Sequence, residues 1–296
     1  MLDTEYYEYL DGLMEKYNTG KQLTDEEVED FCLCMKPELV NNYRICDDER
    51  FCTLYLENLA ADQEGVKLSE EKQKYLNEFY TAWEIIILNE RHSDKLLKYS
   101  AEEARNEIKN IRKKFEKNGD SIESQEFKKK RRISILRSKF FYLKTKSVLN
   151  QLGQLPLKLT FNGSYVEVDE YTYVHLLFRH FGQLTKPEDF DKTYFTEEIQ
   201  LEQIPDVIQY LLESVDICGF SDDEFNHKIA FKYNGRFYRI YFKEAERGEK
   251  GKGNVKYRRV NTFYPIEKQS EIDDLMTNYE EKNLYENLKL YIRKRN

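Results

Sequence analysis

The chain has 296 residues, a length typical of about two domains, and its 40% of apolar residues excludes a disordered chain. The longest apolar run covers only residues 85–88, which is too short for a membrane-spanning helix, and we expect no membrane partner. The net charge is −8, and the odd number of cysteines, five, favours a reducing compartment, so we expect a cytoplasmic protein.

Helical signals fill the first half of the chain. Thr24 is a candidate N-cap with Glu27 three residues later, and Ser69 precedes a second acidic first turn. Asn118 and Gly119 interrupt the charged segment that follows. The expected helices cover 2–18, a segment that starts at Thr24, a segment from Ser69 to about Ile87, 100–116 and 124–149.

At Pro156 the apolar pattern changes to the alternation that is typical of strands. Two Asn-Gly pairs, at Asn162 and Asn234, predict tight hairpin turns. Residues 246–254 are rich in glycine and charge, which predicts a mobile loop. The expected strands cover 157–161, 165–168, 229–233, 236–243 and 256–266, and the expected helices cover 170–181, 196–214 and 270–295.

These elements predict an α+β fold in two domains. An all-helical domain at 1–150, with a basic last helix, precedes a small α+β domain at 151–296 that has an antiparallel sheet and a C-terminal helix.

Four cysteines of the N-terminal half raise the question of a zinc site. They are Cys32, Cys34, Cys46 and Cys52, and their spacing contains no CxxC pair, which zinc modules use. We therefore expect core cysteines and no metal or other cofactor, and keep a zinc module as an alternative.

Positive charge is concentrated in two segments of this acidic chain. Residues 105–146 hold fifteen Lys/Arg against five Asp/Glu, and residues 228–268 hold twelve against four. The densest run, 127–132, includes Lys129 and Arg131, which are candidate contacts to a nucleic-acid backbone. The alternative is a solvated helix face that pairs with the acidic N-terminal helices.

Two histidines follow the first predicted hairpin. His175 and His180 are five residues apart, a spacing that puts them on different sides of a helix, so we expect at most one in any single site. Arg179 shares the side of His175. A histidine titrates near neutral pH and can act as acid or base, but a structural role is the alternative for either one.

Cations, aromatic rings and hydroxyls alternate on the strands that follow. Arg239, Tyr241 and Lys243 share one face of a strand. On the next strand, alternation puts Arg258, Thr262 and Tyr264 on one side and Arg259 on the other. Such a face can bind a phosphodiester, stabilise the negative charge that grows on it during cleavage and stack bases. The alternative is the polar outer face of an ordinary antiparallel sheet. RNA supplies its own nucleophile, the 2′-hydroxyl, so one histidine as acid or base would need no metal.

The order of elements at about 150–268, with the segments HLLFRH, NGRFYRIYFKEA and VNTFYPI, resembles the barnase–EndoU–colicin–RelE nuclease superfamily and its phage-associated branch. The resemblance implies a metal-independent, toxin-type ribonuclease of a phage or mobile element. It implies His175 or His180 as acid or base, Arg239 and Lys243 as phosphate ligands, and Thr262 as a donor to the phosphate. Tyr264 is a further matched position, and the residue pattern itself adds Tyr241, Arg179, Arg258 and Arg259 as candidate contacts to the nucleic acid.

Two hypotheses follow for the whole chain. In the first, the ribonuclease-like domain is fused to a helical domain that binds a protein partner. In the second, the chain is a non-catalytic protein that binds nucleic acid or protein.

Overall fold

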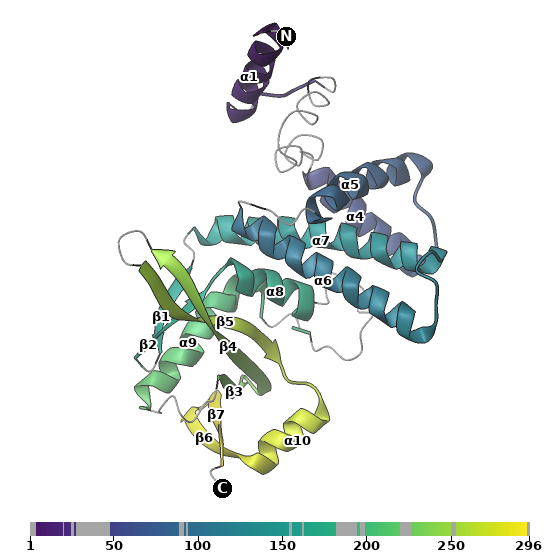
Figure 1. Ribbon diagram of the computed structural model, residues 1–296. Helices are drawn as coiled ribbons and strands as arrows, with labels where there is room; N and C mark the ends of the chain where they lie inside the picture. Colours follow the sequence, from purple (N-terminus) through teal and green to yellow (C-terminus); the bar gives the residue numbers. More distant parts are fainter. Residues whose placement is uncertain are drawn as a thin grey trace. The chain divides into compact units, whose positions relative to one another are not determined.

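The computed structural model of the protein describes residues 4–19, 21–24, 27, 48–88, 92, 94–153, 156–161, 163–181, 194–195, 199–219, 227–249 and 253–294 (Figure 1). The chain divides into two compact units, Met1–Leu143 and Lys144–Asn296, which we call the helical unit and the mixed unit. The division falls inside a long helix, close to the boundary near residue 150 that the sequence predicts. The predicted α+β fold class, helical first and mixed afterwards, is confirmed.

Long helices make up the described part of the helical unit. Two capping signals of the sequence form their expected hydrogen bonds. Glu27 and Thr24 exchange the two hydrogen bonds of a capping box, at 3.0 and 3.2 Å, and the Ser69 hydroxyl accepts from the amide of Lys72. The helices are α1 (Thr4–Asn18), α4 (Asp48–Glu64), α5 (Glu70–Leu88), α6 (Lys95–Asn118) and α7 (Gln125–Leu152).

Helix α6 begins five residues before the predicted start at residue 100. Asp94 is its N-cap, and its carboxylate accepts from the amide of Leu97 at 2.7 Å. Gly119 ends the helix in the left-handed conformation (φ 77°), which fits the predicted break.

Aromatic side chains fill the core of the helical unit. The ring of Tyr55 on α4 stacks on Phe140 of α7, with centroids 4.7 Å apart, and Phe51 meets Phe79 of α5 edge to face. The indole of Trp83, fully buried, donates to the hydroxyl of Ser138 at 2.7 Å. These contacts fix α4, α5 and α7 against one another.

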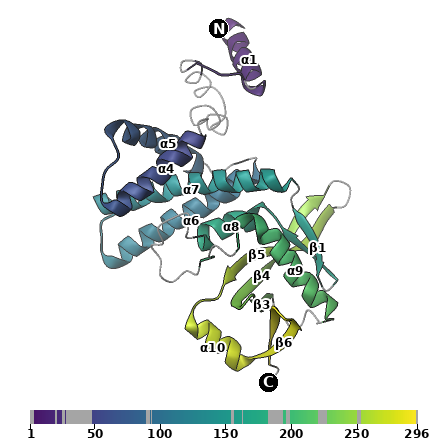
Figure 2. The ribbon, with the colours of Figure 1, turned by 180° about the vertical axis from the view of Figure 1, so that it is seen from behind.

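The mixed unit is built on a seven-stranded sheet in the order β1-β2-β5-β4-β3-β7-β6 (Figures 1 and 2). All neighbouring strands are antiparallel except β2 and β5. The strands are β1 (Leu157–Phe161), β2 (Ser164–Val168), β3 (Lys228–Tyr233), β4 (Arg236–Glu249), β5 (Gly253–Pro265), β6 (Tyr279–Tyr285) and β7 (Leu288–Arg293).

Both predicted Asn-Gly hairpins are present. Asn234 (φ 47°) and Gly235 (φ 83°) join β3 to β4 with the two left-handed residues of a type I′ turn. Gly163 (φ 72°) lies in the turn between β1 and β2.

Helices cover the two faces of the sheet differently. Buried side chains such as Ile240 and Phe242 make one face apolar, and α9 (Ile204–Ile217) packs on this side, in contact with β1 and with Tyr285 of β6. Helix α10 (Gln269–Asn278) packs Leu275 against Ala230 of the other face. Helix α8 (Glu170–His180) follows β2 and packs against β5.

Three sequence predictions in this unit are wrong or need adjustment. Residues 270–295 are not one helix, because α10 ends at Asn278 and β6 and β7 follow. Residues 246–249 and 253–254 are not a loop but the paired ends of β4 and β5. The predicted helix at 196–214 is shorter at its start, where a 3-10 turn at Leu201–Gln203 leads into α9, with Pro205 in the first helical turn rather than at a kink.

Among the described residues, no helix is long and apolar enough to cross a membrane.

Candidate functional site

A β-bulge decides which side chains share the face that carries Arg239. Arg239 lies opposite Tyr264 and Tyr241 opposite Thr262, so all four side chains lie on one side of the sheet. Between Tyr241 and Phe242 the register shifts by one residue. As a result Arg259 lies opposite Lys243, where an unshifted register would put Val260, so Arg259 and not Arg258 shares the side of the sheet that carries Lys243. We call the side with Arg239, Tyr241, Thr262 and Tyr264 the Arg239 face.

Both histidines of α8 belong to one row of rings that ends on this face. His180 stacks on Tyr264, with centroids 5.0 Å apart and planes 11° apart, and Tyr264 in turn stacks on Tyr241. His175 meets His180 edge to face at 6.3 Å, and Tyr171 stacks on His175 at 5.7 Å. The row therefore runs from the first turn of α8 to the middle of β4.

The histidines are closer than the sequence predicts. An ideal helix separates residues five apart by about 140°, which led us to expect only one of them in a site. His180 is the last residue of α8, where the helix ends, and its ring meets that of His175. Both imidazoles are half-buried. An acid and a base can thus be supplied from one helix.

Arg239 is held inside the protein rather than presented to solvent. Its side chain is 7% exposed, and its Nη1 donates to Oε2 of Glu271 on α10 at 2.6 Å. The hydroxyl of Tyr264 lies 3.4 Å from the same carboxylate oxygen. Burial works to lower the pKa of the Arg239 guanidinium, but Tyr264 and Glu271 outweigh burial and raise it. Arg239 is therefore a permanent cation with a carboxylate already bound to it.

Two hydroxyls of the Arg239 face bear on ligand binding: that of Tyr264 already donates to Glu271, whereas that of Thr262 is buried. Burial raises the pKa of the Tyr264 hydroxyl, so it is protonated at neutral pH. Thr262 is 8% exposed, and its hydroxyl has no hydrogen-bond partner among the described residues. A buried hydroxyl without a partner carries a desolvation cost that a ligand atom would remove.

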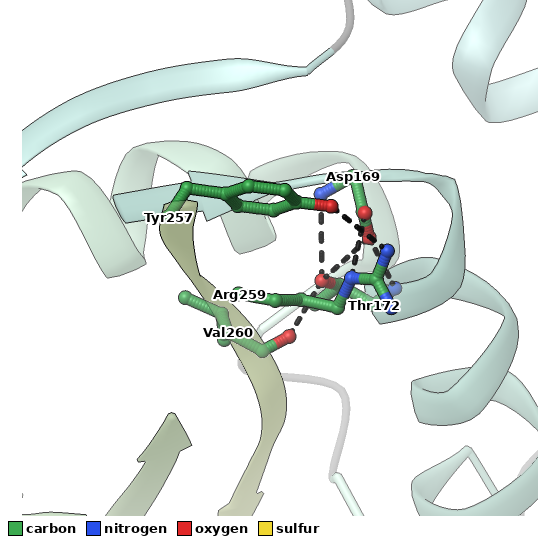
Figure 3. Close-up of polar contacts among 5 residues, drawn as sticks. All are labelled: Asp169, Thr172, Tyr257, Arg259 and Val260. Atoms are coloured by element: carbon green, nitrogen blue, oxygen red, sulfur yellow. Dashed lines mark hydrogen bonds and ion pairs between the residues drawn. The ribbon is translucent and has the colours of Figure 1, made fainter. Parts of the chain in front are cut away.

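Arg259 forms a second closed cluster at the N-terminus of α8 (Figure 3). Its Nε donates to Oδ2 of Asp169 at 2.7 Å, and its Nη2 donates to the hydroxyl of Tyr257 at 3.1 Å. The guanidinium carbon lies 4.9 Å from the centroid of the Tyr171 ring. Arg259 is thus bound on several sides, at the far end of the ring row from Arg239.

The other predicted cations of the mixed unit lie nearer to solvent. Lys243 is exposed on β4, whereas Arg258 on β5 and Arg179 on α8 are half-buried. Of the predicted ligands for a phosphate, Lys243 is the one with an exposed ammonium.

The basic run of α7 is paired inside the helical unit. Lys129 lies 3.6 Å from Asp62 of α4, and Arg131 lies 2.6 Å from Glu84 of α5. Arg132 donates to the side-chain oxygen of Asn77 on α5. The pairing with acidic helices that we held as the alternative accounts for these positions, and nucleic-acid binding by Lys129 and Arg131 stays a prediction.

Three of the four candidate zinc ligands, Cys32, Cys34 and Cys46, lie outside the described residues, and Cys52 is half-buried on α4. Within the described ranges, no group of three His, Cys, Asp or Glu side chains is arranged to hold a metal ion.

Three residues of the two clusters, Glu271, Asp169 and Tyr171, were not among the predicted site residues. Glu271 lay in a stretch predicted as a long terminal helix. The Asp169 signal was present, because an aspartate directly before a predicted helix is an N-cap candidate with Thr172 at the third helical position.

No protein-family model, curated protein or solved structure matches this chain.

Proposed function

We propose that the mixed unit is a metal-independent ribonuclease that cleaves RNA by transesterification. The observation that carries the proposal is the pair of histidine rings 6.3 Å apart, of which His180 stacks on Tyr264 of the Arg239 face. This reaction needs a base and an acid, and two neighbouring imidazoles can serve as this pair.

The reaction uses the 2′-hydroxyl of the substrate. One imidazole, neutral, accepts the proton of this hydroxyl while O2′ forms a bond to phosphorus. The bond from phosphorus to O5′ breaks, and the second imidazole, protonated, gives its proton to O5′. The products are a 2′,3′-cyclic phosphate and a 5′-hydroxyl. One imidazole has gained a proton and the other has lost one, so the charge of the pair is unchanged.

The neighbouring groups have supporting roles. The hydroxyls of Thr262 and Tyr264 donate to the phosphoryl oxygens, on which negative charge grows. Lys243 supplies an exposed cation. Arg239 contributes its charge next to Glu271, which a phosphate oxygen must share or displace. Tyr241 offers a ring for a base to stack on.

The test is the cleavage of a short RNA labelled at its 5′ end by the full chain in excess EDTA. We expect a 2′,3′-cyclic phosphate product, and a loss of about 10²–10⁴-fold in kcat for His175→Gln and for His180→Gln. The matched control is His227→Asn, which changes the exposed histidine at a left-handed position before β3. An RNA with a 2′-deoxy residue at the cut position should resist. No cleavage by the wild-type chain would refute the proposal.

The same proposal includes the wider setting that the resemblance implies. The mixed unit would be a toxin-type member of the barnase–EndoU–colicin–RelE superfamily from a phage or mobile element, acting in the cytoplasm. The helical unit would bind a protein partner. Capture of one defined protein by the full chain, lost when surface residues of α4 and α5 are changed, would test this part.

A second candidate function is non-catalytic binding of RNA or protein. The observation in its favour is that Arg239 and Arg259 are each ion-paired, to Glu271 and Asp169. A protein of this kind would retard RNA in a gel without cutting it, and His180→Gln would leave that binding unchanged.

A further inference from the structure

The cluster around Arg259 and the histidine pair share one helix. Asp169 uses its two carboxylate oxygens for different purposes: Oδ2 binds Arg259 on β5, and Oδ1 accepts from the amide of Thr172 at 3.2 Å (Figure 3). The hydroxyl of Thr172 donates to the carbonyl of Val260 at 2.6 Å. Two consecutive residues of β5 therefore anchor the first turn of α8.

This first turn leads directly to the histidines. Tyr171, whose ring lies under the Arg259 guanidinium, is also the ring on which His175 stacks, with planes 17° apart. His175 then contacts His180. A displacement of Tyr171 would thus be passed to His175 through a ring contact, over a single turn of helix.

We infer that Arg259 is a positioning residue, which fixes α8 and Tyr171 so that His175 faces His180. The inference rests on the proposed function for its catalytic consequence, but not for its structural one. Arg259 would act through Tyr171 and Asp169, without touching the substrate.

The chemistry of the contacts explains why this residue is an arginine. A guanidinium is planar, so its nitrogens can donate to Asp169 and Tyr257 while its central carbon lies over the ring of Tyr171. A lysine ammonium would keep the charge but lose the planar group over the Tyr171 ring and the second directed donor. The side chain of Arg259 is 16% exposed and that of Asp169 is 7% exposed, so the pair is well shielded from competing water.

The test compares three variants of the full chain with the wild type: Arg259→Gln, Arg259→Lys and Asp169→Asn. Asparagine is also a good N-cap, so Asp169→Asn keeps the cap and removes only the ion pair, which protects the test if Arg259→Gln fails to fold. The control is Lys256→Gln, an exposed cation of the same strand in an ion pair with Glu246 at 3.7 Å. Two readouts are needed: the ring-proton resonances of His175 and His180 in NMR spectra, and kcat with a short RNA.

We expect the His175 resonances to move in Arg259→Gln and Asp169→Asn, because a displaced Tyr171 ring changes the ring-current shift that it exerts on His175. The shift should be smaller in Arg259→Lys. We expect kcat to fall by about 100-fold in Arg259→Gln, the effect of misplacing a catalytic group by about 1 Å, with KM little changed. His175 resonances that stay in place in Arg259→Gln and Asp169→Asn, as in Lys256→Gln, would overturn the inference. Resonances that move in a protein that cuts no RNA would support the positioning role and refute only the ribonuclease.

Discussion

His180 stacks on Tyr264 with ring centroids 5.0 Å apart and planes only 11° apart. This contact links the last residue of α8 to the C-terminal end of β5. Tyr264 lies opposite Arg239 and contacts its partner Glu271, so the stack joins the histidines to the charged part of the Arg239 face. The geometry of the candidate site depends on this ring.

The first prediction concerns the ring of Tyr264. Tyr264→Ala removes the surface on which His180 stacks, and we expect it to lower the free energy of unfolding by about 3 kcal/mol and to displace the His180 ring resonances. Tyr264→Phe keeps the stack and loses the hydroxyl, with its long contact of 3.4 Å to Glu271 and its hydrogen bond with Arg239, so it should cost about 1 kcal/mol. Urea denaturation and NMR measure both effects. An unchanged His180 resonance in Tyr264→Ala would show that the stack does not hold the ring.

The second prediction concerns the ion pair of Arg239 and Glu271. Glu271→Ala leaves a buried guanidinium without its carboxylate, and we expect a loss of about 3 kcal/mol, since Glu271 keeps 29% of its side chain exposed. Glu271→Gln keeps an acceptor oxygen and should cost less. Urea denaturation of the two variants, with the exposed Glu267→Gln as a control, provides the comparison. Equal stability of Glu271→Ala and wild type would mean that water replaces the carboxylate at no cost.

Local signals made part of the fold predictable. The Asn-Gly turns, the alternation around them and the caps at Thr24 and Ser69 each act over a few residues, so one sequence suffices to find them. The C-terminal error has a simple cause. Leu288 and Ile292 are four residues apart, a spacing that puts them on one side of a helix and also on one side of a strand. Both are buried in β7, which pairs with β3.

The candidate site was less predictable because its contacts join distant parts of the chain. The pair of Asp169 and Arg259 spans 90 residues, and that of Arg239 and Glu271 spans 32. The bulge that puts Arg259 opposite Lys243 changes which residues of β5 face each side of the sheet, although the sequence of β5 alternates regularly. Residue types and alternation identified the face, but only the fold supplies the acidic partners that neutralise its arginines.

The third prediction concerns a buried lysine of the helical unit. Lys139 is 1% exposed, and its ammonium lies 5.1 Å from the ring centroid of Phe51, 5.2 Å from that of Trp83 and 3.5 Å from Asp48. Because burying a charge is costly, Lys139→Met should leave the unit as stable or make it more stable, whereas Lys139→Ala opens a cavity and should cost about 2–5 kcal/mol. Trp83 is the sole tryptophan of the sequence, so its fluorescence in urea reports on this unit. A large loss in Lys139→Met would instead assign the ammonium a net stabilising role.

The last prediction concerns stability at high pH. Burial, together with a hydrogen bond to Glu84, raises the pKa of the Tyr80 hydroxyl to about 12, against about 10 in the unfolded chain. Because the folded pKa is the higher one, the contribution of Tyr80 is complete below pH 10, and it declines as pH rises from about 10 through 12, where the unfolded chain loses the proton more readily.

Tyr80→Phe isolates this contribution, since lysines and other tyrosines titrate equally in both proteins. Near pH 8 we expect wild type to be more stable by about 1 kcal/mol, because Tyr80 donates to Glu84 at 2.6 Å. The difference between the urea midpoints of the two proteins, followed by Trp83 fluorescence, should shrink steadily between pH 9.5 and about pH 11.5. A difference that stays constant or grows over this range would contradict the raised pKa, and would mean that the hydroxyl ionises at least as easily in the folded protein as in the unfolded chain.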